Sequence, residues 1–351
     1  MNDATNERKI EHIQAIEDDA LTDRMGNYFD QVKLTHRALP QIALKDVNTQ
    51  CYFLDKQLSF PLLISSMTGG DHQLIRRINR NLAIAAEQCG VALAVGSQRV
   101  MFNNEAAKES FELRQFAPST VLLSNLGAVQ FNEGYGIEHA KKAVEILDAD
   151  GLYLHLNALQ EAVQFEGDTD FSQLNERIAS VVQGLDKPVL LKEVGAGFSC
   201  ADIDLGLEAG VRYFDVAGKG GTSWSRIEHH RNQHRQSEGS NPADQLGLSF
   251  QDWGIDTVSA LKMLNGYTDR STLISSGGLR NGIDMVKSVI LGASICGMAA
   301  PFLKPAMESP EAVVEQIERL RKEFKTAMFL LGIKDVNSLI NNDSLLLNER
   351  Y

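Results

Sequence analysis

The chain has 351 residues, 43% of them hydrophobic and 23% charged, and its 46 acidic against 34 basic residues give a net charge of −12. An acidic balance argues against broad nucleic-acid or membrane-surface binding, and no apolar run reaches the roughly 18 residues that a membrane-spanning helix needs. The four cysteines have no metal-ligand spacing. We therefore expect a soluble, cytoplasmic protein with reduced thiols.

Eight short apolar runs recur along the chain, and each ends in a glycine, a polar or a charged residue. They cover residues 61–66, 91–95, 120–124, 151–156, 188–192, 211–216, 271–276 and 293–298. Most are nearly continuous in apolar residues, as are parallel strands covered on both faces. Helical spacing appears between them at 75–88, 136–147, 174–184, 203–209, 253–264 and 282–291. This alternation predicts an α/β fold, a closed (β/α)8 TIM barrel, over the alternative of an open doubly wound sheet.

Three segments do not belong to the repeat. Residues 1–60 form an N-terminal extension, part of which is expected to cap the barrel of residues 61–305. Residues 306–351 form a C-terminal helical tail with an amphipathic helix at 313–331. The polar segment 218–250 follows the sixth strand, so we expect a long functional loop on the catalytic face.

Residues at the carboxyl ends of the predicted strands carry the chemistry, because barrel active sites form there. Gly277-Gly278 and Ala299-Ala300 follow the last two strands, where backbone N–H groups commonly bind phosphate. Lys192 ends the fifth strand, where it either pairs with a neighbouring carboxylate or neutralises an anionic cofactor ring. His155 ends the fourth strand and is either a hydrogen-bonded structural residue or part of the site.

Several motifs together resemble one family. They are Arg8-Lys9-x-Glu11-His12, Ser66-Met-Thr68, Ser97-Gln-Arg99, Leu156-Asn-Ala-Leu-Gln-Glu161, Lys192-Glu-Val-Gly195, Gly220-Gly-Thr-Ser-Trp224 and Ser276-Gly-Gly-Leu-Arg280. From about residue 8 to residue 335 the chain resembles the type 2, FMN-dependent isopentenyl-diphosphate isomerases of isoprenoid biosynthesis.

The resemblance implies a set of ligands and site residues. FMN would lie at the barrel mouth against Ser66, Met67, Thr68, Ser97, Asn125, Lys192, Thr222, Gly277, Gly278, Arg280, Ala299 and Ala300. The substrate diphosphate would meet Arg8, Lys9, Ser97, Gln98, Arg99 and Gln160, with the N-terminal extension as a clamp and Glu161 holding Mg²⁺. Gln160, His155 and Lys192 would form the catalytic set. The resemblance also implies NADPH as the reductant of FMN and a homo-tetramer or larger homo-oligomer.

Other enzymes share this barrel. An FMN-dependent 2-hydroxyacid oxidase usually carries an aspartate before the glycine pair, where Ser275-Ser276 stand here. Inosine-monophosphate dehydrogenase needs a nucleophilic cysteine after the sixth strand, where residues 218–221 contain none. A non-catalytic flavin-binding scaffold would not need His155, Gln160 and Glu161 at one mouth. Whether flavin N5 or Gln160 transfers each proton stays open, and the His-rich stretch 228–236 receives no role.

Overall fold

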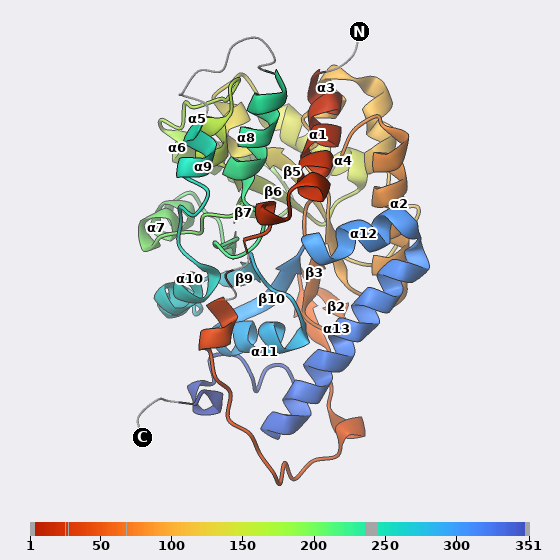
Figure 1. Cartoon of the computed structure of the whole chain (residues 1–351), viewed down its shortest axis with the longest axis vertical. Coiled ribbons are helices and arrows are strands. Elements are labelled where there is room, and N and C mark those ends of the chain that lie inside the picture. The colour runs from red at the N-terminus through yellow and green to blue at the C-terminus, as the bar shows by residue number, and fades with distance from the viewer. Residues whose placement is uncertain (1–3, 25, 27, 68, 236–244, 348–351) are drawn as a thin grey trace.

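A computed structural model describes residues 4–24, 26, 28–67, 69–235 and 245–347, without the side chains of residues 4–10, 234 and 235. Eight parallel strands close into a barrel, with the last strand paired to the first (Figure 1). The strands are β3 (Leu62–Ile64), β4 (Ala92–Ala94), β5 (Leu122–Gly127), β6 (Gly151–Leu156), β7 (Val189–Glu193), β8 (Tyr213–Asp215), β9 (Thr272–Ser276) and β10 (Ala293–Met298). The predicted (β/α)8 fold is confirmed.

Helices cover the outside of the barrel, so the strands are buried on both faces. The main ones are α2 (Gln73–Cys89), α4 (Ile137–Leu147), α6 (Leu174–Gly184), α7 (Cys200–Glu208), α10 (Thr257–Leu264) and α11 (Gly282–Ile290). Helix α10 begins four residues later than its hydrophobic pattern predicts, because the Asp256 side chain accepts a hydrogen bond from the Ser259 N–H (2.9 Å) and caps the helix there. Further helices at the mouth are α3 (Val100–Asn103), α5 (Ala158–Val163) and α12 (Ala300–Glu308).

The N-terminal extension contributes to both ends of the barrel. The hairpin of β1 (Cys51–Phe53) and β2 (Lys56–Leu58) closes the amino-terminal end, where Phe53 is buried and packs edge-on against Tyr213 at the start of β8, 6.2 Å between ring centroids. Helix α1 (Ala4–Asp18) lies at the opposite end, beside α8 (Trp224–Arg235) (Figure 1).

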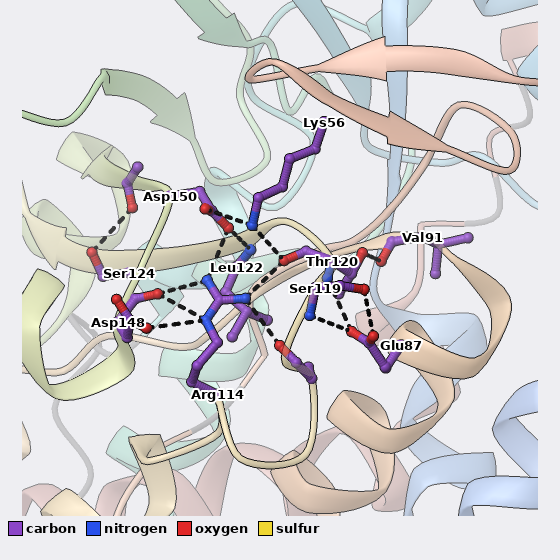
Figure 2. A network of polar contacts seen from close by, with 12 residues as sticks. Lys56, Glu87, Val91, Arg114, Ser119, Thr120, Leu122, Ser124, Asp148 and Asp150 are labelled. Carbon is purple, nitrogen blue, oxygen red and sulfur yellow. Dashed lines mark hydrogen bonds and ion pairs between the residues drawn. The ribbon is translucent and has the colours of Figure 1, made fainter.

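An ion-pair network ties the hairpin to the starts of the strands (Figure 2). Asp150, just before β6, accepts hydrogen bonds from the Leu122 N–H and from Arg114, both at 2.9 Å, and pairs with Lys56 of β2 at 2.7 Å. Arg114 also donates to the carbonyl of Thr120 (2.9 Å). Because this end is remote from the strand carboxyl ends, we assign the network to stability.

The C-terminal tail packs across the barrel wall. Helix α13 (Pro310–Leu331) starts at Ser309, whose hydroxyl accepts from the Ala312 N–H (3.2 Å), and it lies against α2 and α11. Its buried stripe includes Val313, Ile317, Leu320, Phe324 and Leu331. None of the helices that the structure describes is long and apolar enough to cross a membrane.

The segment after β8 differs from its prediction as a loop. It contains α8 and a short α9 (Leu246–Ser249). Helix α8 has no apolar stripe for periodicity to detect, because several of its polar residues face α1. Arg226 and His230 of α8 both contact Asp19, which follows α1 directly.

Candidate active site

A cavity of about 250 Å³ opens at the carboxyl ends of the strands, under α1 and α8. Nearly all the residues that the family resemblance assigned to FMN line it: Ser66, Met67, Ser97, Asn125, Lys192, Thr222, Gly277, Gly278, Arg280, Ala299 and Ala300. Thr68 lies outside the described residues. His12, Ile13 and Ile16 close the cavity from α1.

The expected diphosphate contacts do not all reach the cavity. Ser97, Arg99 and Gln160 line it. Gln98 does not: it is fully buried, its amide group donates to the carbonyl of Ala143 (3.0 Å), and its carbonyl accepts from the Asn125 N–H (3.0 Å). Its side chain therefore joins β5 to α4, and its role as a substrate contact stays a prediction. The side chains of Arg8 and Lys9 lie outside the described part of α1.

A row of polar side chains crosses the cavity floor. Asn125 donates to the Ser66 hydroxyl (2.8 Å), and its side-chain oxygen lies 2.8 Å from Nδ1 of His155. Because an amide oxygen only accepts, Nδ1 of His155 carries the hydrogen in this arrangement. Both expected roles of His155 thus meet in one residue, which is hydrogen-bonded and also faces the cavity.

Lys192 is 6% exposed and lies at the end of β7, where its Nζ pairs with Asp215 at 2.9 Å. It also lines the cavity, so the two interpretations of Lys192 are compatible. Sequence reasoning missed Asp215, since an aspartate inside an apolar run at residues 211–216 gave no sign of its partner.

One end of the cavity suits a phosphate group. Ala299 and Ala300 stand at the amino terminus of α12, line the cavity and have no side-chain cap. Pro301 has no N–H and the Phe302 N–H donates to the Ala299 carbonyl (2.9 Å), so the Ala300 N–H is the group of this first turn that can serve a phosphate. The first N–H of α11 is already used, because Gly282 donates to Glu323 of α13 (2.8 Å). Gly277 has a φ of +95°, and a Cβ there would lie 2.0 Å from the carbonyl oxygen of Gly218, so this close turn requires glycine.

A hard cation suits the opposite side. Glu161 is 5% exposed and accepts from the Asn157 side chain (2.7 Å) and from the Asp168 N–H (2.8 Å). The side-chain oxygen of Asn157 is buried without a hydrogen-bond partner among the described residues. No group of three or more His, Cys, Asp or Glu ligands converges within that same part of the chain. This sparse oxygen set fits Mg²⁺, which commonly takes one or two carboxylates and completes its shell with substrate phosphates and water.

The roof contains Glu228 and Arg231 of α8, to which the sequence analysis assigned no role. Glu228 of α8 is fully buried and accepts from Gln160 (2.7 Å), and it contacts Nε2 of His12 (3.2 Å). Burial raises the pKa of Glu228, but the hydrogen bond and charge of His12 and the charge of Arg231 outweigh this effect and hold the pKa at about 2. The i, i+3 spacing of Glu228 and Arg231 was the available sequence signal.

The fold and a family match together place the chain among the FMN-dependent barrel proteins. Residues 138–346 match the FMN-dependent dehydrogenase family. Among solved structures, the chain resembles a flavocytochrome b2 variant with pyruvate bound (TM-score 0.66, 18% identity, 96% of this chain and 82% of that one) and a mandelate oxidase variant (TM-score 0.63, 17% identity, 94% and 97%). At these identities the likeness concerns the fold alone.

Sequence relatives then narrow the class to one family. The isopentenyl-diphosphate delta-isomerase of Paracoccus zeaxanthinifaciens is 56% identical over 343 residues, covering 97% of this chain and 96% of the relative. That of Hydrogenovibrio crunogenus is 53% identical, covering 97% of each. The chain belongs to the isopentenyl-diphosphate delta-isomerase family, and its FMN-dependent dehydrogenase region identifies the FMN-dependent type. The family predicted from the motifs is confirmed.

Proposed function

We propose that the protein interconverts isopentenyl diphosphate and dimethylallyl diphosphate in isoprenoid biosynthesis, with reduced FMN and Mg²⁺. The observation that carries this proposal is one cavity, in a chain 56% identical to a named isomerase, that brings Lys192 and the amino terminus of α12 together with Gln160 and Glu161. The cavity therefore has one end suited to a phosphorylated cofactor and another suited to a metal-bound diphosphate.

The chain's own residues orient the cofactor. The α12 terminus and Arg280 would hold the FMN phosphate, and Lys192 and Asn125 would face the ring. Reduced FMN, when bound, supplies an electron-rich surface beside the alkene. Arg280 is fixed for this task, because it donates to the carbonyl of Gly220 (2.8 Å) and pairs with Asp23 (2.8 Å).

Diphosphate and metal would lie toward α5. Glu161 and the unpaired oxygen of Asn157 would hold Mg²⁺, and Arg99 and Ser97 would contact the diphosphate, with Arg8 and Lys9 as further contacts. Arginine suits this role because its guanidinium binds phosphate in a bidentate manner.

Gln160 is proposed to lie beside the reacting carbons. Glu228 accepts from the Gln160 nitrogen, so the Gln160 oxygen is oriented away from Glu228, where it accepts a long hydrogen bond from Asn157 (3.4 Å). A carbonyl oxygen has two lone pairs, so the second one would serve as a proton acceptor or relay. The reaction adds one proton to the terminal alkene carbon and removes another from the carbon nearer the diphosphate. His12 and Trp224 close the roof with an edge-on contact, 5.1 Å between ring centroids, which excludes water from the cationic carbon.

We further propose that NADPH reduces the FMN, that the protein is a homo-tetramer or larger homo-oligomer, and that it is cytoplasmic. The motif resemblance supports the reductant and the oligomer, and the four cysteines, none of which forms a disulfide, support the location.

The test is an anaerobic isomerase assay of the purified protein with FMN, Mg²⁺ and NADPH, omitting each in turn. We expect a yellow protein whose activity is lost when FMN or Mg²⁺ is omitted, and dithionite is expected to replace NADPH. A protein that neither binds FMN nor isomerises the substrate contradicts the proposal.

A further inference from the structure

Four neighbouring strands place a buried polar cluster beneath the cavity floor. Asp215 at the end of β8 has no exposed surface. Its Oδ2 accepts from Nζ of Lys192 (2.9 Å) and from the Tyr153 hydroxyl (3.0 Å), and its Oδ1 accepts from the Ser276 hydroxyl. Lys192 and Asp215 are direct partners in the β7–β8 register. The cluster is therefore fixed by main-chain pairing.

The cluster has an upper and a lower layer. Lys192 and Ser276 line the cavity, whereas Asp215 and Tyr153 do not. Asp215 consequently cannot touch a bound ligand, and it acts through Lys192. Tyr153 is also fully buried, and burial followed by the Asp215 charge raises its pKa well above the ordinary value, so Tyr153 stays a neutral donor.

A buried carboxylate is costly unless a cation and hydrogen bonds compensate it. Here three donors from three strands meet one carboxyl group. Lys192 has a second acceptor in the Ser276 hydroxyl (3.3 Å). The ammonium group is thus held in one position, and much of its charge is offset by Asp215 before any ligand arrives.

We propose that Asp215 is a positioning residue that sets the net charge Lys192 presents to the flavin ring, and so sets the flavin's reduction potential. The inference rests on the proposed contact between Lys192 and FMN. Two-electron reduction of FMN with uptake of one proton adds one negative charge to the ring, and an uncompensated ammonium group stabilises that charge. With Asp215 present, the stabilisation is reduced, and the flavin is kept a stronger reductant.

The experiment measures the equilibrium between FMN-loaded protein and a reference dye during anaerobic reduction. Asp215→Asn keeps the shape of the side chain and removes its charge, so we expect the equilibrium to shift at least tenfold toward reduced FMN, about 30 mV for a two-electron couple. Lys192→Gln is expected to shift it in the opposite direction. Tyr153→Phe, the matched control, removes one hydrogen bond to the same carboxylate without a change of charge and is expected to stay within about threefold.

The possible results distinguish failure of the role of Asp215 from failure of the proposed function. An unchanged or lowered potential in Asp215→Asn, with a lowered one in Lys192→Gln, overturns the role of Asp215 and leaves the proposed function standing. Unchanged potentials in both variants overturn the Lys192–flavin contact and the inference with it. Failure of the unaltered protein to bind FMN refutes the proposed function itself. If Asp215→Asn does not fold by circular dichroism, Asp215→Ser, which leaves room for water, is measured against the same expectation.

Discussion

Arg99, a proposed diphosphate contact, forms an ion pair with the carboxylate of Asp168 in the structure. Its guanidinium lies 2.7 Å from Oδ2 of Asp168. A diphosphate must therefore replace Asp168 at Arg99, and Asp168 acts as an internal competitor. Asp168→Asn is expected to lower the KM for isopentenyl diphosphate. The main-chain N–H of Asp168, which donates to Glu161, remains in this variant.

The size of the effect follows from the exposure of the pair. The side chains of Arg99 and Asp168 are 32% and 21% exposed, so solvent screens their attraction substantially. Pairs of this kind contribute up to about 1 kcal/mol, which corresponds to roughly a fivefold change in affinity. Loss of the repulsion between Asp168 and the diphosphate acts in the same direction. We expect the KM to fall by about twofold to tenfold while FMN binding is unchanged.

The assay is the steady-state rate at saturating Mg²⁺ and reduced FMN, together with the inhibition constant of inorganic pyrophosphate. Asp170→Asn is the matched control, because Asp170 is an exposed carboxylate of the same loop that bonds Ser172 and carries the same charge. A KM in Asp168→Asn that equals or exceeds that of the unaltered protein refutes competition. A simultaneous rise in the Mg²⁺ requirement would assign Asp168 to the metal instead.

Two further substitutions test the metal and the roof. Glu161→Gln should retain yellow, FMN-loaded protein but lose roughly 100-fold or more in activity, since metal stabilisation is worth several kcal/mol; an unchanged Mg²⁺ titration of the rate places the metal elsewhere. The pKa of Glu228 is about 2 in the folded protein against an ordinary value of 4.5, so its stabilising contribution is present above about pH 4.5 and is lost as the pH falls toward 2. In urea unfolding across this range, the free energy of unfolding should fall less steeply with decreasing pH in Glu228→Gln than in the unaltered protein. Glu166→Gln, which removes a more exposed partner of Arg231, should retain the full decrease.

The barrel was predictable because its signal is local. The runs at 151–156 and 293–298 match β6 and β10 residue for residue, since strands covered on both faces are nearly continuous in apolar residues. Helix α8 was not predictable in this way. It is stabilised by polar contacts with a segment about 210 residues earlier in the chain, such as His230 with Asp19, and periodicity cannot report such contacts.

Some residues of the site were also predictable from the sequence, and others were not. Motif spacing identified Lys192, Gln160 and Glu161, all of which reach the cavity. It also assigned Gln98, which does not line the cavity, because adjacency in a motif does not reveal which way a side chain points. Gln98 and Arg99 lie in the turn that leads into α3. Asp215 and Glu228 were missed because they act through other residues and belong to no motif that touches a ligand.

The lysine and arginine side chains that line the cavity in the described part of the chain are each paired with a carboxylate. Lys192 pairs with Asp215, Arg99 with Asp168, and Arg280 with Asp23. Binding of a diphosphate at Arg99 is then an exchange of one anion for another, so its net electrostatic gain is smaller than the number of cations suggests. Lys192 differs, because its carboxylate is buried behind it and cannot be displaced into solvent. The exchangeable pair at Arg99 is thus suited to a diphosphate that comes and goes, and the fixed pair at Lys192 is suited to a cofactor ring that stays.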